Sequence, residues 1–426
     1  MHVKTILNRV QRHPSFVYER VRLVEGDVLR LEVEVRARTN SRPCCSGCGR
    51  PGPGYDTLPP RRFEFVPFWG IAVFLVYAMR RVDCPSCSVR VERVPWAMGK
   101  HTLTDTYLWF LASWARRLSW KEVAEVFRTS WDKVFAAVEM AVEWGRAHQD
   151  LSGIRSIGVD EIAWQRNHRY ATVVYQIDEH CRRLLWVGPE RKAKTLLAFF
   201  RWLGAERSAA LTFICSDMWK PYLKVIAKKA SQAVHVLDRF HIMAHFSKAI
   251  DKVRSEETRE LKAKGYEPVL KNTRWLLLKR PENLTETQEP RLAELVRYNL
   301  RSVRAYLLKE DFQFFWDYVS PHWAGQFLDR WCTRTMRSRL EPMKKVARML
   351  RRHRPLLLNW FRAKKAISGG AVEGFNNKAK LTLRKSYGFR SYRVLELSLY
   401  HSLGALPEPH VTHRFWEQPA RLQSSW

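Results

Sequence analysis

Four cysteines stand in two pairs, and each pair has a spacing that can hold a metal ion. Cys45 and Cys48 enclose Ser-Gly, and Cys84 and Cys87 enclose Pro-Ser. A two-residue gap lets two thiolates bind one ion, and two such pairs complete a tetrahedral zinc site with four cysteine ligands. Cys44 is a rival ligand to Cys45, although only Cys45 keeps the two-residue gap. We expect one zinc ion with a structural role, in a zinc ribbon, because no open coordination position is indicated.

Two aspartates are candidates for a second metal site. Asp160 lies in the β-rich run IRSIGVDEIAW, and Asp217 ends the run ALTFICSD. The predicted elements from residue 154 onward are three strands, a helix, a strand, a helix and a strand. This order is the ribonuclease-H-like pattern, in which the first and fourth strands are adjacent and parallel. The two aspartates are therefore predicted to meet at one sheet edge, whereas a lone acid at a strand end is usually a turn residue or a helix cap.

A third acid, Glu373, stands in the segment SGGAVEGFNNKAK, which runs from Ser368 to Lys380. Two carboxylates alone do not hold a pair of magnesium ions, and a third on a helix that crosses the sheet edge would complete the site. On such a helix Asn377 lies roughly 40° from Glu373, and Lys380 and Arg384 lie within about 20° of it. Oxygen-only ligands favour Mg²⁺, and we expect two such ions in the active site. Mn²⁺ is expected to be able to substitute for them.

One face of this predicted helix carries an acid for metal ions and then amides and bases that can follow a phosphate backbone. The residues that we expect to contact DNA are Asn376, Asn377, Lys380, Arg384, Lys385 and Arg390. Gly369 and Gly370 would let a substrate strand approach closely. A solvated charged helix is the alternative interpretation, but it does not predict the glycines, the paired asparagines or the one-sided order of charge.

The charge of the whole chain favours a nucleic-acid partner. The 426 residues are enough for two to four domains, and 74 Lys and Arg against 42 Asp and Glu give a formal net charge of +32. An excess of this size is typical of proteins that bind polyanions. The N-terminus has no apolar signal core, and the run from Ile71 to Met79 is too short to span a bilayer. We expect a cytoplasmic, nucleoid-associated protein that binds double-stranded DNA and no membrane.

A helical segment follows the cysteine pairs. Apolar residues recur at helical spacing in residues 103–145, and Ser119 and Ser130 stand where helix N-caps belong. The break at residues 128–130 has helix-turn-helix proportions, and the helix that begins at Trp131 is predicted to enter a DNA groove. A three-helix packing unit that does not touch DNA would show a similar pattern.

The chain resembles a family of bacterial transposases. The segments GVDE, CSDMWKPY, VLDRFHIM and GGAVEGFNNKAKLTLRKSYGFRSY are similar to the catalytic signatures of insertion-sequence transposases of the ISL-three type. The zinc ribbon and helix-turn-helix stand in the same order as in that family, so the resemblance covers nearly the whole chain. It implies a DDE catalytic triad of Asp160, Asp217 and Glu373. Glu161 is the usual neighbour of the first acid, and strand alternation directs it to the opposite face.

The segment from Asp238 to His241 is similar to an Asp-x-x-His element that several groups of DDE transposases carry after the fifth strand. His241 is expected to contact the scissile phosphate or to support a metal ligand. As an ordinary residue in the first turn of a helix it would instead be structural.

The predicted fold class is multidomain α+β, with the ribonuclease-H-like α/β catalytic domain interrupted by a helical insertion. The expected parts are an N-terminal zinc-ribbon domain (1–100), a helix-turn-helix region (101–150), the first part of the catalytic core (151–250), the insertion (251–362), the final catalytic helix (363–403) and a C-terminal tail (404–426).

The resemblance implies a DNA transposase that binds the terminal inverted repeats of an insertion sequence and catalyses metal-dependent cleavage and strand transfer. Its DNA partners would be the transposon ends and the target, and we expect a homodimer or higher oligomer on DNA. One alternative is a sequence-specific regulator with an inactive catalytic fold, but all three acids are present. The other is a ribonuclease-H-like nuclease without strand transfer, which the two N-terminal DNA modules argue against.

Overall fold

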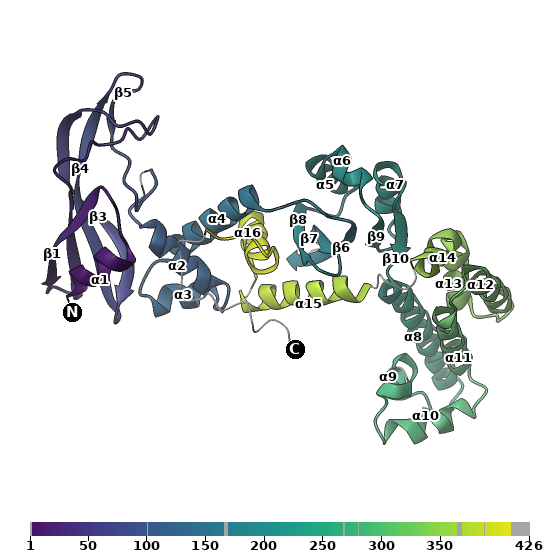
Figure 1. Ribbon diagram of the computed structural model, residues 1–426. Helices are drawn as coiled ribbons and strands as arrows, with labels where there is room; N and C mark the ends of the chain where they lie inside the picture. Colours follow the sequence, from purple (N-terminus) through teal and green to yellow (C-terminus); the bar gives the residue numbers. More distant parts are fainter. Residues whose placement is uncertain are drawn as a thin grey trace. The chain divides into compact units, whose positions relative to one another are not determined.

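The computed structural model describes residues 2–99, 101–165, 169–266, 269–279, 281–363, 369–386 and 388–409. The chain divides into two compact units, of which one is Met1–Asp150 with Lys385–Trp426 and the other is Leu151–Arg384. Figure 1 labels most of the helices and strands of both units. The part of the expected C-terminal tail from residue 410 onward lies outside the described residues.

The first unit begins with a five-stranded sheet in the order β1-β2-β4-β3, with β5 paired to β4. Its elements are α1 (Val3–Val10), β1 (Phe16–Val24), β2 (Arg30–Ala37), β3 (Gly54–Phe68), β4 (Ile71–Cys84) and β5 (Ser88–Val91). The apolar run that begins at Ile71 is strand β4, as predicted, and its buried residues alternate because one face covers a core. The indole of Trp96 lies at the centre of that core, in edge-to-face contact with Phe16, Phe63 and Tyr77.

Four helices complete the first unit: α2 (Asp105–Ala115), α3 (Trp120–Val126), α4 (Trp131–His148) and α16 (Tyr392–Leu403). Ser119 forms a capping box at the start of α3, and the Ser130 side chain accepts a hydrogen bond from the backbone of Lys133 in α4, so both predicted N-caps are confirmed. Arg128 turns the chain between α3 and α4 with a φ of 50°. Arg393 of α16 donates hydrogen bonds to glutamates of α4, which fixes the C-terminal helix to this unit.

The second unit contains a sheet in the order β10-β9-β6-β7-β8. The elements are β6 (Ser156–Gln165), β7 (Arg169–Ile177), β8 (Arg182–Pro189), α5 (Ala193–Leu203), α6 (Ala205–Ala209), β9 (Phe213–Ser216), α7 (Lys220–Lys229) and β10 (Val234–Leu237). Strands β6 and β9 pair in parallel, as the sequence predicts for the first and fourth strands, and β9 pairs in parallel with β10.

The two faces of this sheet carry different helices. Ile157 and Val159 of β6 share a core with Phe199 of α5 and Tyr222 of α7. The alternate residue Gly158 faces helix α15 (Gly369–Lys385), since a Cβ atom placed there would lie 2.3 Å from Val372. Figure 1 shows α5 and α15 on opposite sides of strands β6 to β8.

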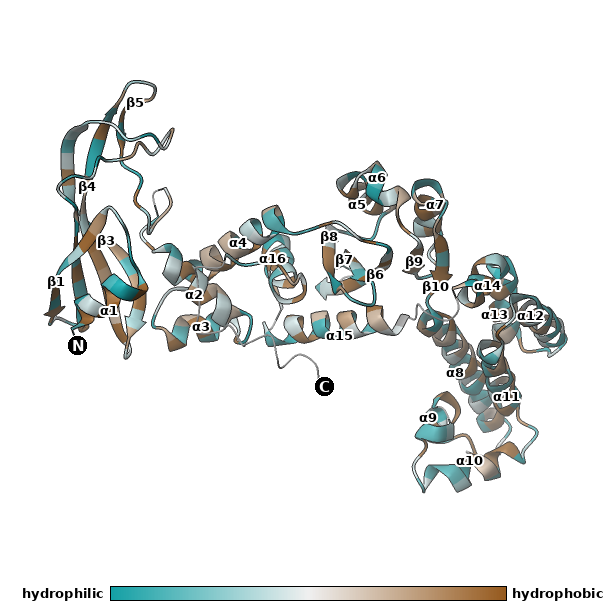
Figure 2. Ribbon diagram, in the orientation of Figure 1, coloured by the Kyte–Doolittle hydropathy of each residue, from teal (hydrophilic) through white to brown (hydrophobic). Residues whose placement is uncertain are grey.

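A helical segment joins β10 to α15. It comprises α8 (Arg239–Ala263), α9 (Arg274–Leu278), α10 (Gln288–Val296), α11 (Arg301–Gln313), α12 (Pro321–Met336), α13 (Glu341–Arg352), α14 (Arg354–Arg362) and the short helices η1 (Pro281–Asn283) and η2 (Phe314–Asp317). Figure 2 shows these helices with hydrophilic and hydrophobic residues interspersed, and their apolar residues share one core with Val236 and Leu237 of β10. Among the described residues, no helix is both long and apolar enough to cross a bilayer.

The contact between Gly158 and Val372 generates a stability prediction. In Gly158→Ala the added Cβ atom would lie 2.3 Å from Cγ2 of Val372, and we expect the variant to lose about 1–3 kcal/mol of unfolding free energy through overpacking. The change Val372→Ala should be destabilising alone, yet it should recover part of the loss in the double variant because it makes room for the new methyl group. Urea unfolding of the four proteins would measure this coupling. Additive losses would contradict the assigned contact.

Candidate active site

Three aspartates stand side by side where the parallel strands stop pairing. Val159 of β6 pairs with Ser216, and Ser216 pairs with Leu237. The next residues along the three strands are Asp160, Asp217 and Asp238, and all three are buried. Since neighbouring strands lie only about 4.8 Å apart, the register brings these acids to one place at the sheet edge.

Asp160 is held by helix α15. Its Oδ2 accepts a hydrogen bond from the Asn376 side-chain amide, and its Oδ1 accepts one from the backbone N–H of Glu161 at 2.7 Å. The Tyr175 hydroxyl of β7 in turn donates to Oδ1 of Asn376 at 3.0 Å. The Tyr175 ring also stacks on Phe375 of α15, with centroids 4.7 Å apart. This network fixes the first acid against the helix that carries Glu373.

Asp217 is held on the other side by Arg191. Arg191 Nη2 donates to Asp217 Oδ2 at 2.8 Å, and Arg191 Nε lies 2.6 Å from Glu161 Oε1. The guanidinium also lies over the Trp219 ring, 4.7 Å from its centroid. Asp160 therefore contacts α15 while the neighbouring Glu161 contacts Arg191, although both acids line the same cavity.

Sequence reasoning did not find Arg191, because it follows strand β8 among other basic residues and no motif marks it. A structural signal precedes it, since Glu190 has a φ of 65°, which is uncommon for a residue with a side chain. The Glu190 backbone is held by β7: its N–H donates to the Tyr170 carbonyl, and its carbonyl accepts from the Thr172 hydroxyl. This fixed turn positions Arg191 over the acids.

Asp238 begins helix α8 and orients His241. Asp238 Oδ1 accepts the N–H of Phe240, as an N-cap does, and Oδ2 accepts a hydrogen bond from His241 Nδ1 at 2.9 Å. That bond raises the pKa of His241 to about 9, although burial acts in the opposite direction. The charges of Asp160 and Asp217 raise it further. His241 thus carries a proton at neutral pH and places a cation among the acids.

A cavity of about 290 Å³ joins most of these residues. Its polar lining residues are Asp160, Glu161, Asp238, His241, Glu373, Asn376 and Lys380. The structure therefore brings the predicted first and third acids together with His241. Asp217 does not line this cavity and lies beside it, bound to Arg191.

The buried acids favour the binding of cations. Burial raises the pKa of Asp160, and burial together with the nearby Asp217 charge raises the pKa of Glu161 to about 8. Ionised carboxylates are costly in such a place unless positive charge compensates them. Arg191 and His241 supply part of this charge, and oxygen ligands in a cavity suit a divalent cation.

The residues predicted to contact DNA differ in exposure. Asn377, Lys380, Arg384 and Arg390 are exposed. The Asn376 side chain is only 8% exposed and is occupied by Asp160 and Tyr175. Lys385 is half-buried and donates a hydrogen bond to the carbonyl of Arg117 in the first unit.

The four paired cysteines form a separate cluster in the first unit. The Sγ atoms of Cys45, Cys48, Cys84 and Cys87 all lie within 4.8 Å of one another, and Cys44 is not in the group. Backbone N–H groups of Cys48 and Gly47 lower the pKa of Cys45 to about 7, whereas the hydrogen bond with Cys48 raises the pKa of Cys87 to about 12. The arrangement can hold one metal ion.

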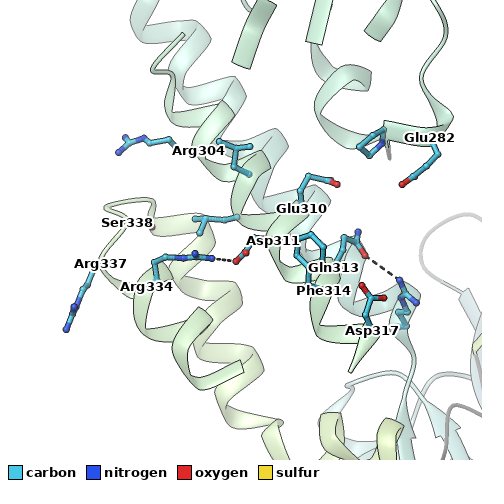
Figure 3. Close-up of a pocket in the computed structure, with 14 residues that line it drawn as sticks. Glu282, Arg304, Glu310, Asp311, Gln313, Phe314, Asp317, Arg334, Arg337 and Ser338 are labelled. Carbon is cyan, nitrogen blue, oxygen red and sulfur yellow. Dashed lines mark hydrogen bonds and ion pairs between the residues drawn. The ribbon is translucent and has the colours of Figure 1, made fainter. Parts of the chain in front are cut away.

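A larger cavity of about 970 Å³ lies in the helical segment, between α11, α12 and η1. Figure 3 shows the ion pair of Arg334 with Asp311 in this cavity. Its charged lining residues are Arg239, Arg304, Arg334 and Arg337 against Glu282, Glu310, Asp311 and Asp317. Because these charges balance, the cavity offers no distinct site for an anion.

Comparisons with known proteins identify the family of the chain. Residues 157–399 match the family model of ISL3-type DDE transposases, described as "Transposase", and this segment contains Asp160, Asp217 and Glu373. The chain is 32% identical over 400 residues to the transposase for insertion sequence element IS1557 of Mycobacterium tuberculosis, with 87% of this chain and 88% of that protein covered. It is 29% identical over 358 residues to the transposase for insertion sequence element IS1001 of Bordetella parapertussis, with coverages of 83% and 87%.

The pairing of Asp238 with His241 generates a prediction on pH. The pKa of His241 is about 9 in the folded protein, above the unfolded value of about 6.5. The stabilisation by the protonated pair is therefore complete below about pH 6.5 and is lost as the pH rises through about 9. In Asp238→Asn we expect the His241 midpoint to fall toward 6.5, measured by NMR titration of labelled histidines. A His241→Asn variant identifies the resonance, and an unchanged midpoint would show that Asp238 does not hold the proton there.

Proposed function

This chain belongs to the ISL3 family of insertion-sequence transposases and is a DNA transposase, and we propose that it cleaves DNA at the ends of its element and joins them to a target through Asp160, Asp217 and Glu373. The observation that carries the proposal is the meeting of acids from separate parts of the chain at one sheet edge. Asp160 and Glu373 line one cavity. Asp217 follows the strand that pairs in register with β6.

The architecture of the second unit supports a ribonuclease-H-like catalytic core. In the sheet order β10-β9-β6-β7-β8, strand β6 is antiparallel to β7 and parallel to β9, and the sequence pattern predicted the parallel pairing of the first and fourth strands. The helices α8 to α14 would be an insertion between the fifth strand and the helix of the third acid. A plain nuclease with this core would cleave DNA without joining it, so the assay for the proposal includes both reactions.

Two divalent ions, when bound to the three acids, would stabilise the attacking and leaving oxygens of an in-line phosphoryl displacement. The residues of the chain fit such ions, because the site offers carboxylate oxygens. Asp160 and Asp217 are buried, Glu373 is exposed at the cavity, and burial raises the pKa of Asp160. Mg²⁺ is the proposed ion. The chain itself orients the ligands: Asn376 positions Asp160, and Arg191 positions Asp217.

His241 and Lys380 have roles toward the DNA in this proposal. Both line the cavity, and neither is enclosed, since the His241 side chain is 42% exposed and Lys380 is exposed. A protonated His241 can donate a hydrogen bond to a phosphate oxygen from the nitrogen that does not face Asp238. Lys380, Asn377 and Arg384 would neutralise the phosphates that lead to the scissile bond.

The first unit would recognise the terminal inverted repeats. Helices α3 and α4 with the turn at Arg128 have the proportions of a helix-turn-helix, and α4 begins with a half-exposed Trp131. Base-edge contacts from such a helix specify sequence, whereas phosphate contacts only position the protein. The cysteine cluster would stabilise the same unit by holding a structural zinc ion.

The cysteine geometry fits zinc. Four thiolates at about 2.3 Å from one ion stand about 3.8 Å from each other in a tetrahedron. The Sγ atoms of Cys48 and Cys84 are 3.6 Å apart, and the four Sγ atoms lie within 4.8 Å of one another. Small adjustments therefore complete a closed site with four thiolate ligands.

The acids generate the prediction on activity. In Asp160→Asn, Asp217→Asn and Glu373→Gln we expect the rate of cleavage to fall by more than roughly 10–100-fold, which is the loss that follows removal of a residue that hydrogen-bonds to a metal ligand. Binding of the element's ends should be retained. Cleavage is mapped on duplexes that carry those ends, with Mg²⁺, and strand transfer is followed with a plasmid target. Glu161→Gln should have a milder effect.

The matched control is Glu256→Gln, since Glu256 is an acid of α8 that lies outside the cavity and pairs only loosely with Lys252, at 3.9 Å. It should cleave like the unchanged protein. Retained cleavage in any one of the three acid variants removes that residue from the triad. A protein that binds the ends and never cuts them would instead be a regulator.

The cysteine cluster generates a prediction on metal content. Elemental analysis of the purified protein should find one zinc per chain, and Cys45→Ser should lose most of it, whereas Cys44→Ser should keep it because Cys44 lies outside the cluster. Chelation should also lower the melting temperature of the first unit. Full zinc content in Cys45→Ser would overturn the ligand assignment.

A further inference from the structure

A basic groove lies on the face of the catalytic sheet that is turned away from α15. It has a volume of about 1090 Å³ and runs between α5, α6 and α7. Its charged lining residues are Arg201, Lys220, Lys224, Lys228 and Lys229, and none of the residues that line it is acidic. Leu197, Phe200 and Val225 form an apolar floor. The groove thus gathers positive charge on one defined surface.

The cations of this groove are free of protein partners. Arg201 and the four lysines are exposed, and in the described part of the chain none of them forms an ion pair. Some exposed lysines elsewhere pair with an acid one helical turn away, as Lys121 does with Glu125, while others, such as Lys262, form no ion pair in the described part of the chain. The cavity of the helical segment balances its arginines with acids (Figure 3). What distinguishes the groove is that five cations line one surface on which no lining residue is acidic.

The spacing of the lysines suits a phosphate backbone. Lys220, Lys224 and Lys228 recur every four residues on one face of α7, which places them about 6 Å apart along the helix axis. The three therefore span about 12 Å, the rise of three to four nucleotides of one DNA strand at 3.4 Å each. Contacts of this kind neutralise phosphates and carry no sequence information.

The position of α7 connects the groove to the site of reaction. Lys220 opens the helix only three positions after Asp217, so the row of lysines begins at the edge where the acids meet. The basic residues after Glu373 lie on α15, on the opposite face of the same sheet. The catalytic unit thus has two basic surfaces that diverge from one site, as a reaction that joins two DNA molecules requires.

We propose that the groove between α5 and α7 binds the backbone of target DNA during strand transfer. The inference rests on the proposed function, because it takes the acids as the site of joining. The transposon end binds the protein through its recognised repeat. The flanking DNA is covalently continuous with the transposon end before cleavage. The target has an arbitrary sequence and no covalent link, so it needs its own sequence-independent contacts, which unpaired lysines supply.

The test uses the full chain with Lys224→Gln and Lys228→Gln combined. Random-sequence duplex serves as the binding probe, and the slope of log affinity against log salt should become shallower by about 1.8, or about 0.9 for each lost phosphate contact. Strand transfer of a pre-cleaved transposon end into a plasmid should fall at least about tenfold, while cleavage of a flanked end should stay close to that of the unchanged protein. The matched control is Lys252→Gln with Lys262→Gln, two exposed lysines of α8 outside the groove, which should change neither reaction.

The outcomes separate the possible occupants. Loss of strand transfer with retained cleavage supports target DNA in the groove. Loss of cleavage with retained strand transfer assigns the groove to flanking DNA and overturns the proposal, as does a salt slope equal to that of the control. If the unchanged protein neither cleaves nor joins DNA, the proposed function fails, and the salt slope then still reports whether the groove binds a DNA backbone.

Discussion

The candidate site depends on the contact of α15 with strand β6. The amide of Asn376 donates to Asp160 from a helix that is 216 residues away along the chain, and Gly158 leaves the space into which Val372 packs. A buried carboxylate with a raised pKa would be unfavourable without such a donor. The same hydrogen bond sets the rotation of α15, and this rotation places Glu373 and Lys380 at the cavity. Loss of this contact would separate the third acid from the sheet.

Positively charged side chains lie beside the buried acids and offset their negative charge. Arg191 binds Asp217 and Glu161 on the side of α5 and α7, and His241 binds Asp238 at the start of α8. These cations offset the repulsion of acids that the strand register forces together. Divalent ions would offset this repulsion more strongly. The cationic side chains and the proposed metal ions therefore both compensate the negative charge of the acids. The net charge of the chain, +32, is a separate feature that serves an extended polyanion.

The helical segment between β10 and α15 has its own packing requirement. Buried aromatic residues of α8, α11 and α12, such as Phe246, Phe312 and Trp331, are in ring contact with one another. Glu257 of α8 accepts the N–H groups of Arg301 and Ser302, and so it caps α11 from a distant part of the chain. The segment is therefore internally well packed and is anchored at the strand that precedes α8, so its length does not disturb the meeting of the acids.

Local features of this protein were determined by the sequence. The caps at Ser119 and Ser130, the strand at Ile71, the order of elements after residue 154 and the cysteine pairing follow from residue type and spacing over a few positions. Periodicity also placed Glu373, Lys380 and Arg384 on one face of a helix. The tertiary structure alone decided what covers that face. It buried Asn376 against Asp160, where the sequence suggested contact with DNA, and it brought Arg191 to Asp217. Such contacts join residues far apart in the chain, and they depend on how helices and sheet pack, which spacing within one element does not encode.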